Sequence, residues 1–154
     1  MNEKIERVLI DEKTLKARIA EMGAEISRDY AGEELVVIGL LKGAAYFLTE
    51  LTQHITVPVR IDFIKASSYG SGTKSSGKVD IDYDTSRNIA GKNILLVDDV
   101  IDTGLTLKAV GELFHNRNPK SLKVAAMLDK KESAAGLRWV CHPGRIRGGL
   151  WSGL

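Results

Sequence analysis

Residues 94–107 of the chain read Ile-Leu-Leu-Val-Asp-Asp-Val-Ile-Asp-Thr-Gly-Leu-Thr-Leu. The apolar run at the start of this stretch predicts a buried strand, which ends in two adjacent carboxylates, Asp98 and Asp99. A third acid, Asp102, follows, and residues 103–106 open a helix. The stretch therefore predicts a strand, an acidic turn and a helix start in direct succession.

Each part of this turn has its own chemistry. Two carboxylates at a strand end can accept hydrogen bonds from vicinal hydroxyls such as those of ribose, and can help to hold Mg²⁺. Backbone N–H groups at a helix start, two threonine hydroxyls and the positive end of the helix dipole can hold a phosphate. Taken singly, Asp102 or Thr103 could be a helix cap beside solvated acids. The combination favours a site for a phosphorylated ribose.

Strands and helices alternate along the rest of the chain. Amphipathic spacing predicts a helix from Leu15 to Tyr30, and an apolar run predicts a buried strand from Leu35 to Leu40. Further helices are expected at 43–54 and 104–116, and further strands at 59–64, 92–100 and 122–128. Residues 67–78, rich in Ser and Gly, predict a mobile loop. The alternation predicts an α/β fold with a central parallel sheet flanked by helices, and ligands beyond the carboxyl ends of its strands.

Length and composition indicate a single domain without membrane or nucleic-acid character. The 154 residues suffice for one core. No apolar run approaches the ~20 residues that span a bilayer, and residues 1–10 lack the apolar centre of a secretory signal. Net charge is only +2, with dispersed basic residues. The single cysteine, Cys141, cannot form an internal disulfide, so we expect a cytoplasmic protein. From the hydropathy and the charge we expect that it binds neither membranes nor nucleic acid.

Taken whole, the acid pair, the third acid and the Thr-Gly-x-Thr turn resemble the donor-binding signature of type I phosphoribosyltransferases, and the resemblance extends to about Lys130. It implies that family's fold. It also implies that Asp98 and Asp99 bind Mg²⁺ and the ribose hydroxyls of 5-phosphoribosyl 1-diphosphate. The residues implied to hold the 5-phosphate are Thr103, Gly104, Leu105 and Thr106.

Asp102 distinguishes branches of this family. Members that act on hypoxanthine and guanine place an aspartate here, close to N7 of the purine, so the resemblance implies that Asp102 is the catalytic acid-base residue. A capping aspartate is the alternative. The implied reaction is transfer of the 5-phosphoribosyl group to hypoxanthine, guanine or both, which gives IMP or GMP and diphosphate in purine salvage. The family implies a homodimer or homotetramer.

Three other segments resemble parts of the family's site. Gly39 to Ala44 resembles the Leu-Lys-Gly loop that binds diphosphate, often through a cis Leu–Lys peptide, which implies Lys42 and Gly43 as ligands. Ser68 and Tyr69 resemble the start of the family's lid. Lys130 matches the lysine that donates to the oxygen at purine C6. A solvated lysine is the alternative for both Lys42 and Lys130.

Two other functions compete with the enzyme. A non-catalytic nucleotide-sensing or regulatory protein could use the same scaffold, although Asp102 favours the enzyme. A receiver-type acid pocket would explain Asp98 and Asp99 but not the turn at residues 103–106.

The end of the chain departs from the family. After Lys131 the family continues to Gly-Phe-x-Ile-Pro-Asp-x-Phe-Val-Val-Gly-Tyr-Gly-Leu-Asp, whereas residues 138–154 read Arg-Trp-Val-Cys-His-Pro-Gly-Arg-Ile-Arg-Gly-Gly-Leu-Trp-Ser-Gly-Leu, without strand or helix period. Codons for these residues, read one base later, permit Val-Gly-Phe-Val-Ile-Pro-Asp-Glu-Phe-Val-Val-Gly-Tyr-Gly-Leu-Asp. We therefore predict a phosphoribosyltransferase domain at 1–131 with an incomplete C-terminal part, and an irregular, frameshifted tail at 132–154 that leaves little activity. A divergent, functional tail is the alternative.

Overall fold

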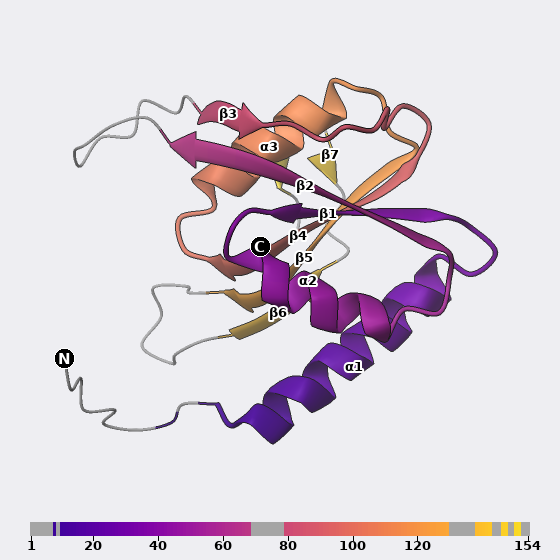
Figure 1. Ribbon diagram of the computed structural model, residues 1–154, viewed down its shortest axis with the longest axis vertical. Coiled ribbons are helices and arrows are strands. Elements are labelled where there is room, and N and C mark those ends of the chain that lie inside the picture. Colours follow the sequence, from indigo (N-terminus) through magenta and orange to yellow (C-terminus); the bar gives the residue numbers. More distant parts are fainter. Residues whose placement is uncertain are drawn as a thin grey trace.

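The protein forms a twisted sheet with helices packed against it, as the computed structural model in Figure 1 shows. The structure describes residues 8, 10–68, 79–129, 138–142, 146–147 and 150–151. Its helices are α1 (Glu12–Asp29), α2 (Ala44–Gln53) and α3 (Leu105–His115). Its strands are β1 (Leu35–Leu40), β2 (Val59–Ser68), β3 (Val79–Tyr83), β4 (Asn93–Ile101), β5 (Ser121–Asp129), β6 (Arg138–His142), β7 (Ile146–Arg147) and β8 (Leu150–Trp151). Within the described residues, no helix has the length and apolar character needed to cross a membrane.

The main sheet has a parallel centre and antiparallel edges. Its strand order is β3-β2-β1-β4-β5-β6. The four central strands, β2, β1, β4 and β5, run parallel, as predicted. Helix α2 connects β1 to β2, and helix α3 connects β4 to β5, as parallel neighbours require a crossover connection. At the edges, β3 pairs antiparallel with β2, and β6 pairs antiparallel with β5. The predicted central parallel sheet is confirmed, and antiparallel strands extend it at both edges.

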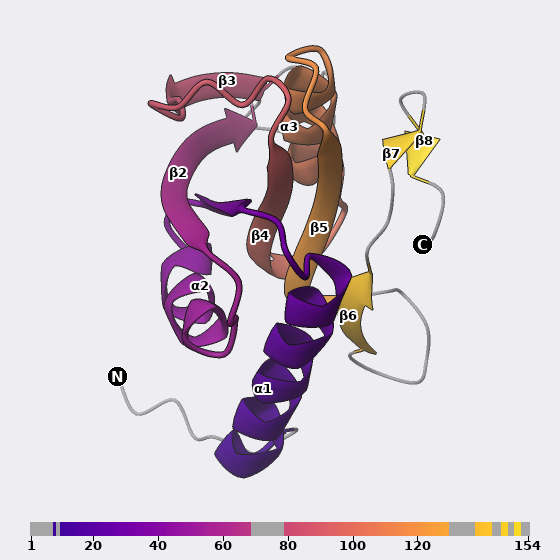
Figure 2. The same ribbon diagram turned by 90° about the vertical axis from the view of Figure 1, so that its right-hand side faces the viewer.

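Two hydrophobic cores cover the two faces of the sheet. On one face, Ile94 and Leu96 of β4 pack with Phe114 of α3. On the other face, Leu95 and Val97 pack with residues of α1 and α2. In Figure 2, α1 and α2 lie together at the bottom of the view and α3 lies apart from them at the top. Because side chains alternate along a strand, consecutive residues at the end of β4 must point to different faces.

Short strands form in the segment that follows residue 131. β6 pairs with the edge of β5, with Val124 opposite His142 and Ala125 opposite Cys141. β7 and β8 form a separate two-stranded ribbon. This differs from the sequence pattern, which has no strand period there. The edge of β5 explains the difference for β6, since an edge strand offers unpaired backbone groups to any neighbouring segment. The domain division at residue 131 stays a prediction.

Candidate functional site

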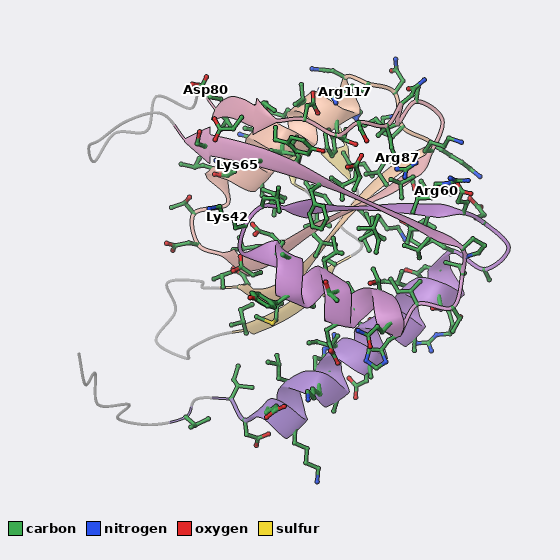
Figure 3. The ribbon with its side chains drawn as sticks, viewed as in Figure 1. Lys42, Arg60, Lys65, Asp80, Arg87 and Arg117 are labelled. Atoms are coloured by element: carbon green, nitrogen blue, oxygen red, sulfur yellow. The ribbon has the colours of Figure 1, made fainter. Side chains whose placement is uncertain are left out.

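The predicted site lies at the carboxyl edge of the sheet, where β1 and β4 are neighbours. These strands pair in parallel from Leu35 opposite Asn93 to Gly39 opposite Val97. The turn after β1 therefore meets the acidic end of β4, although the two segments are far apart in the sequence. Figure 3 shows Lys42 at this edge. The adjacency brings the predicted diphosphate loop next to the predicted ribose-binding acids.

Gly43 lies directly beside the carboxyl group of Asp99. The preceding Leu41–Lys42 peptide is cis, and Gly43 is the N-cap residue of α2. A Cβ atom added to Gly43 would lie 2.7 Å from Cγ and 2.8 Å from Oδ1 of Asp99. Since real Cβ atoms almost never come this close to another heavy atom, a side chain at residue 43 would displace the carboxyl group of Asp99.

Asp98 and Asp99, at the end of β4, border hollows on different faces of the sheet. Asp98 borders a hollow of about 130 Å³ that is otherwise lined by residues 100–107. Asp99 borders a larger and mostly apolar hollow of about 450 Å³, together with Gly43 and residues of α1 and α2. Backbone N–H groups hold both side chains: Asp99 N donates to Asp98 Oδ1 at 2.9 Å, and Val100 N donates to Asp99 Oδ1 at 2.8 Å.

Asp98 is a residue of the site whose pKa is strongly raised. Burial, together with the adjacent Asp99 carboxyl group, raises the pKa of Asp98 to about 7. A bound cation or hydroxyl donors would favour the ionised form instead. The protonation of Asp98 is therefore sensitive to whatever occupies the edge of the sheet.

The turn from β4 into α3 leaves backbone N–H groups open at the start of the helix. Gly104 has a φ of 75°, in the left-handed region, and α3 begins directly after it without a side-chain cap from that residue. Lys108 N donates to Gly104 O at 2.8 Å, which leaves the N–H groups of residues 105–107 at the open first turn of the helix. Thr103 Oγ1 accepts only a long hydrogen bond, of 3.4 Å, from Leu105 N. These groups line the smaller hollow, as a phosphate site requires.

Asp102 lies at the rim of the same hollow with an exposed side chain. The N-cap position of α3 belongs to Gly104, and within the described residues no hydrogen bond links Asp102 to the start of the helix. The role of Asp102, acid-base residue or cap, stays a prediction.

Comparisons with known proteins identify the family. Residues 9–138 match the model of the phosphoribosyl transferase domain. The chain belongs to the phosphoribosyltransferase family. Its relatives include the hypoxanthine-guanine phosphoribosyltransferase of Bacillus subtilis (strain 168), 42% identical over 130 residues that make up 84% of this chain and 72% of the relative. The enzyme of that name from Streptococcus pneumoniae (strain ATCC BAA-255 / R6) is 40% identical over 128 residues, 83% of this chain and 71% of the relative.

Solved structures of phosphoribosyltransferases share the fold. A hypoxanthine-guanine phosphoribosyltransferase from Bacillus anthracis gives a TM-score of 0.79 at 42% identity, over 88% of this chain and 82% of that chain. The hypoxanthine phosphoribosyl transferase of Trypanosoma cruzi gives 0.78 at 38% identity, over 86% and 73% of the two chains. The predicted fold class and family are confirmed.

Three predicted ligands of this phosphoribosyltransferase are not placed with the others. Ser68 is the last residue of β2, and only its backbone is described. Tyr69 and Lys130 lie outside the described residues. The roles of these three residues, like those of the residues in the two turns, stay predictions.

The sequence reasoning missed strand β3 of the phosphoribosyltransferase sheet. Asp82 on this strand accepts a hydrogen bond from Ser67 Oγ at 3.3 Å and lies 3.2 Å from Lys65 Nζ. A signal was present, because residues 79–83 read Val-Asp-Ile-Asp-Tyr, an alternation of apolar and acidic residues that is typical of a strand.

Proposed function

We propose that the chain transfers the 5-phosphoribosyl group from 5-phosphoribosyl 1-diphosphate to a 6-oxopurine, hypoxanthine or guanine, giving IMP or GMP and diphosphate in purine salvage. The observation that carries this proposal is the meeting of three groups at one sheet edge: the Lys42–Gly43 turn, the Asp98–Asp99 pair and the open start of α3. The names of the relatives support the same reaction. Nothing in the relatives favours the regulatory alternative.

Each part of the donor has a matching group in this arrangement. The Lys42–Gly43 turn would bind the diphosphate, and the acid pair would bind the ribose hydroxyls. Thr103, Gly104, Leu105 and Thr106 would bind the 5-phosphate through backbone N–H groups and hydroxyls. Ser68 and Tyr69 would cover the donor, and Lys130 would donate to the oxygen at purine C6.

The acid pair fits Mg²⁺. Within the described residues, no three acidic, histidine or cysteine side chains gather as a closed metal site. Mg²⁺ in phosphate-handling proteins commonly takes one or two carboxylates and completes its shell with substrate oxygens and water. We propose that Asp98 and Asp99 hold Mg²⁺ in this way. When bound, the ion neutralises charge on the diphosphate.

The residues suggest a displacement at ribose C1. The bond from C1 to the diphosphate oxygen breaks, its electron pair stays on that oxygen, and a purine nitrogen forms the new bond from the opposite face. Lys42 spreads the charge of the departing diphosphate. Asp102 accepts the proton from N7 as the base becomes a substituted purine, and returns it in the reverse reaction. Positioning and electrostatics supply most of the rate.

Two further properties belong to this proposal. We propose a homo-oligomer, dimer or tetramer, as the family resemblance implies. We also propose a cytoplasmic location, which the single cysteine supports because the chain has no second thiol with which to form an internal disulfide.

Calorimetry and an activity assay test the proposed function. Titration with 5-phosphoribosyl 1-diphosphate or GMP in the presence of Mg²⁺ should give saturable heats, because the Lys42–Gly43 turn, the acid pair and the turn into α3 all precede the altered tail. Phosphoribosyl transfer to hypoxanthine and guanine should be detectable once the tail is restored to the family's sequence. Absence of binding to both ligands would contradict the proposal.

A further inference from the structure

A second lysine lies beside the turn that carries Lys42. Lys65 on β2 directly follows Ile64, which pairs with Leu40 at the end of β1. Leu41 N still donates to Ile64 O at 2.8 Å, so the chain leaves the sheet beside Lys65 as it enters the Lys42–Gly43 turn. Figure 3 shows both lysines at the same edge of the sheet.

Lys65 also shares a face of the sheet with Asp99. Phe63, two residues earlier on β2, packs against the core formed with α1 and α2, and so does Val97, two residues before Asp99 on β4. Since every second residue of a strand points to the same face, Lys65 and Asp99 extend on that face from the two strands that flank β1. The Lys42–Gly43 turn lies between them.

The only partner of Lys65 within the described residues is one carboxylate. Lys65 Nζ lies 3.2 Å from Asp82 Oδ2, and the two side chains are 43% and 41% exposed. An ion pair this exposed stabilises little, so a more highly charged anion can displace it. Asp82 would keep a partner after the exchange, because Ser67 Oγ also donates to it, at 3.3 Å.

We propose that Lys65 is a second cationic ligand of the leaving diphosphate, and that it exchanges Asp82 for the diphosphate when the Lys42–Gly43 turn is occupied. This inference rests on the phosphoribosyl transfer proposed above. Negative charge builds up on the diphosphate as its bond to ribose C1 breaks. A lysine on β2 can stabilise that charge from across β1, since the acid pair lies on β4, on the other side of β1.

Titration calorimetry of the whole chain with inorganic diphosphate and Mg²⁺ tests the assignment. Lys65→Gln should raise the Kd for diphosphate by about 10- to 150-fold, as expected for loss of a hydrogen bond to a charged group. The Kd for GMP, which has no diphosphate, should not change. Lys65→Arg should retain most of the diphosphate affinity. Asp82→Asn should bind diphosphate at least as tightly as the wild type, because the competing carboxylate is gone.

Lys120 provides the matched control. Its Nζ forms an exposed ion pair with Glu33 Oε2, at 2.7 Å. Lys120 lies just before β5, at the amino end of the sheet. Lys120→Gln should leave both Kd values unchanged. Thermal unfolding of each variant shows whether it is folded, and Asp82→Asn gives an independent measurement if Lys65→Gln does not fold.

Several results would overturn the inference. One is a Kd of Lys65→Gln for diphosphate that stays within twofold of the wild-type value. Another is an equal rise of its Kd values for diphosphate and for GMP. A third is an Asp82→Asn variant that binds diphosphate as weakly as Lys65→Gln does. A wild-type chain that binds GMP but not diphosphate would also overturn it. A wild-type chain that binds neither ligand would instead contradict the proposed function.

Discussion

Asp102 is the residue on which the chemistry of the proposed reaction depends. Its side chain is exposed beside the hollow of about 130 Å³ at the start of α3, where Gly104 occupies the N-cap position. In a chain with the family's C-terminal sequence restored, Asp102→Asn should lower turnover with hypoxanthine by about 10²–10⁴-fold, because general acid-base catalysis is lost. Steady-state kinetics measure this effect. Donor affinity and melting temperature should stay the same, and unchanged turnover would contradict the role.

Gly43 tests the contact between the two halves of the site. Gly43→Ala should destabilise the fold by about 1–3 kcal/mol, because the new Cβ would collide with the carboxyl group of Asp99. The same substitution in an Asp99→Ala background should cost much less, since the colliding atoms are gone. Denaturant unfolding of the four proteins gives the coupling energy. Additive costs would show that the two residues are not in contact.

Because of Asp98, the free energy of unfolding should fall as pH rises. Its folded-state pKa of about 7 lies above the ordinary value of 3.8, so between these two pH values the folded chain keeps a proton that the unfolded chain has lost. The stability due to this proton is fully present below about pH 4 and is lost as pH rises through about 7, by roughly 2–4 kcal/mol. Asp98→Asn should remove this contribution. Urea unfolding from pH 4 to 8 in a chelating buffer measures both curves, and identical slopes would contradict the prediction.

At the scale of elements, the start of α3 depends on the left-handed backbone of Gly104. Gly104→Ala should cost about 1–2 kcal/mol of stability from backbone strain alone, because its Cβ would meet only Ile101 Cγ2, at an ordinary 3.8 Å. It should also weaken GMP binding, since the N–H groups of the first helical turn would shift.

Gly91 is the matched control for this strain. Its φ is 70°, and a Cβ there would meet nothing within 4 Å. It lies at the other end of β4, so Gly91→Ala should cost similar stability and leave the Kd for GMP unchanged. An equal loss of GMP binding in both variants would show that α3 does not position the phosphate.

Most elements could be predicted because local patterns determine them. Every residue of β1 is buried, which matches its continuous apolar run, and α1 follows its amphipathic spacing. Strand β3 is hard to predict because the Ser- and Gly-rich residues before it indicate a loop more strongly than the short alternation at residues 79–83 indicates a strand. The Gly43–Asp99 contact could not be read from the sequence, because it depends on which strands become neighbours.

At the scale of the whole molecule, the tail should limit activity. The chain as given should bind the donor or GMP weakly and show very little transfer, since the proposed frameshift removes the family's residues for the purine base. Replacing residues 138–154 with the sequence that begins Val-Gly-Phe-Val-Ile-Pro-Asp should restore transfer to hypoxanthine or guanine. A radiometric or spectrophotometric assay compares the two chains. Near-normal activity from the unaltered chain would show that its tail is a working variant.

The position of β1 between β2 and β4 also governs when the protein can first bind its donor during synthesis. A ribosome adds about 5–20 residues per second, so the Lys42–Gly43 turn emerges roughly 3–11 s before the acids of β4. During that interval the nascent chain can pair β1 with β2, while the other edge of β1 stays unpaired until β4 has been synthesised. A chain that stalls before residue 98 therefore carries the Lys42–Gly43 turn without the acids of β4, and the proposed donor would lack half of its binding groups.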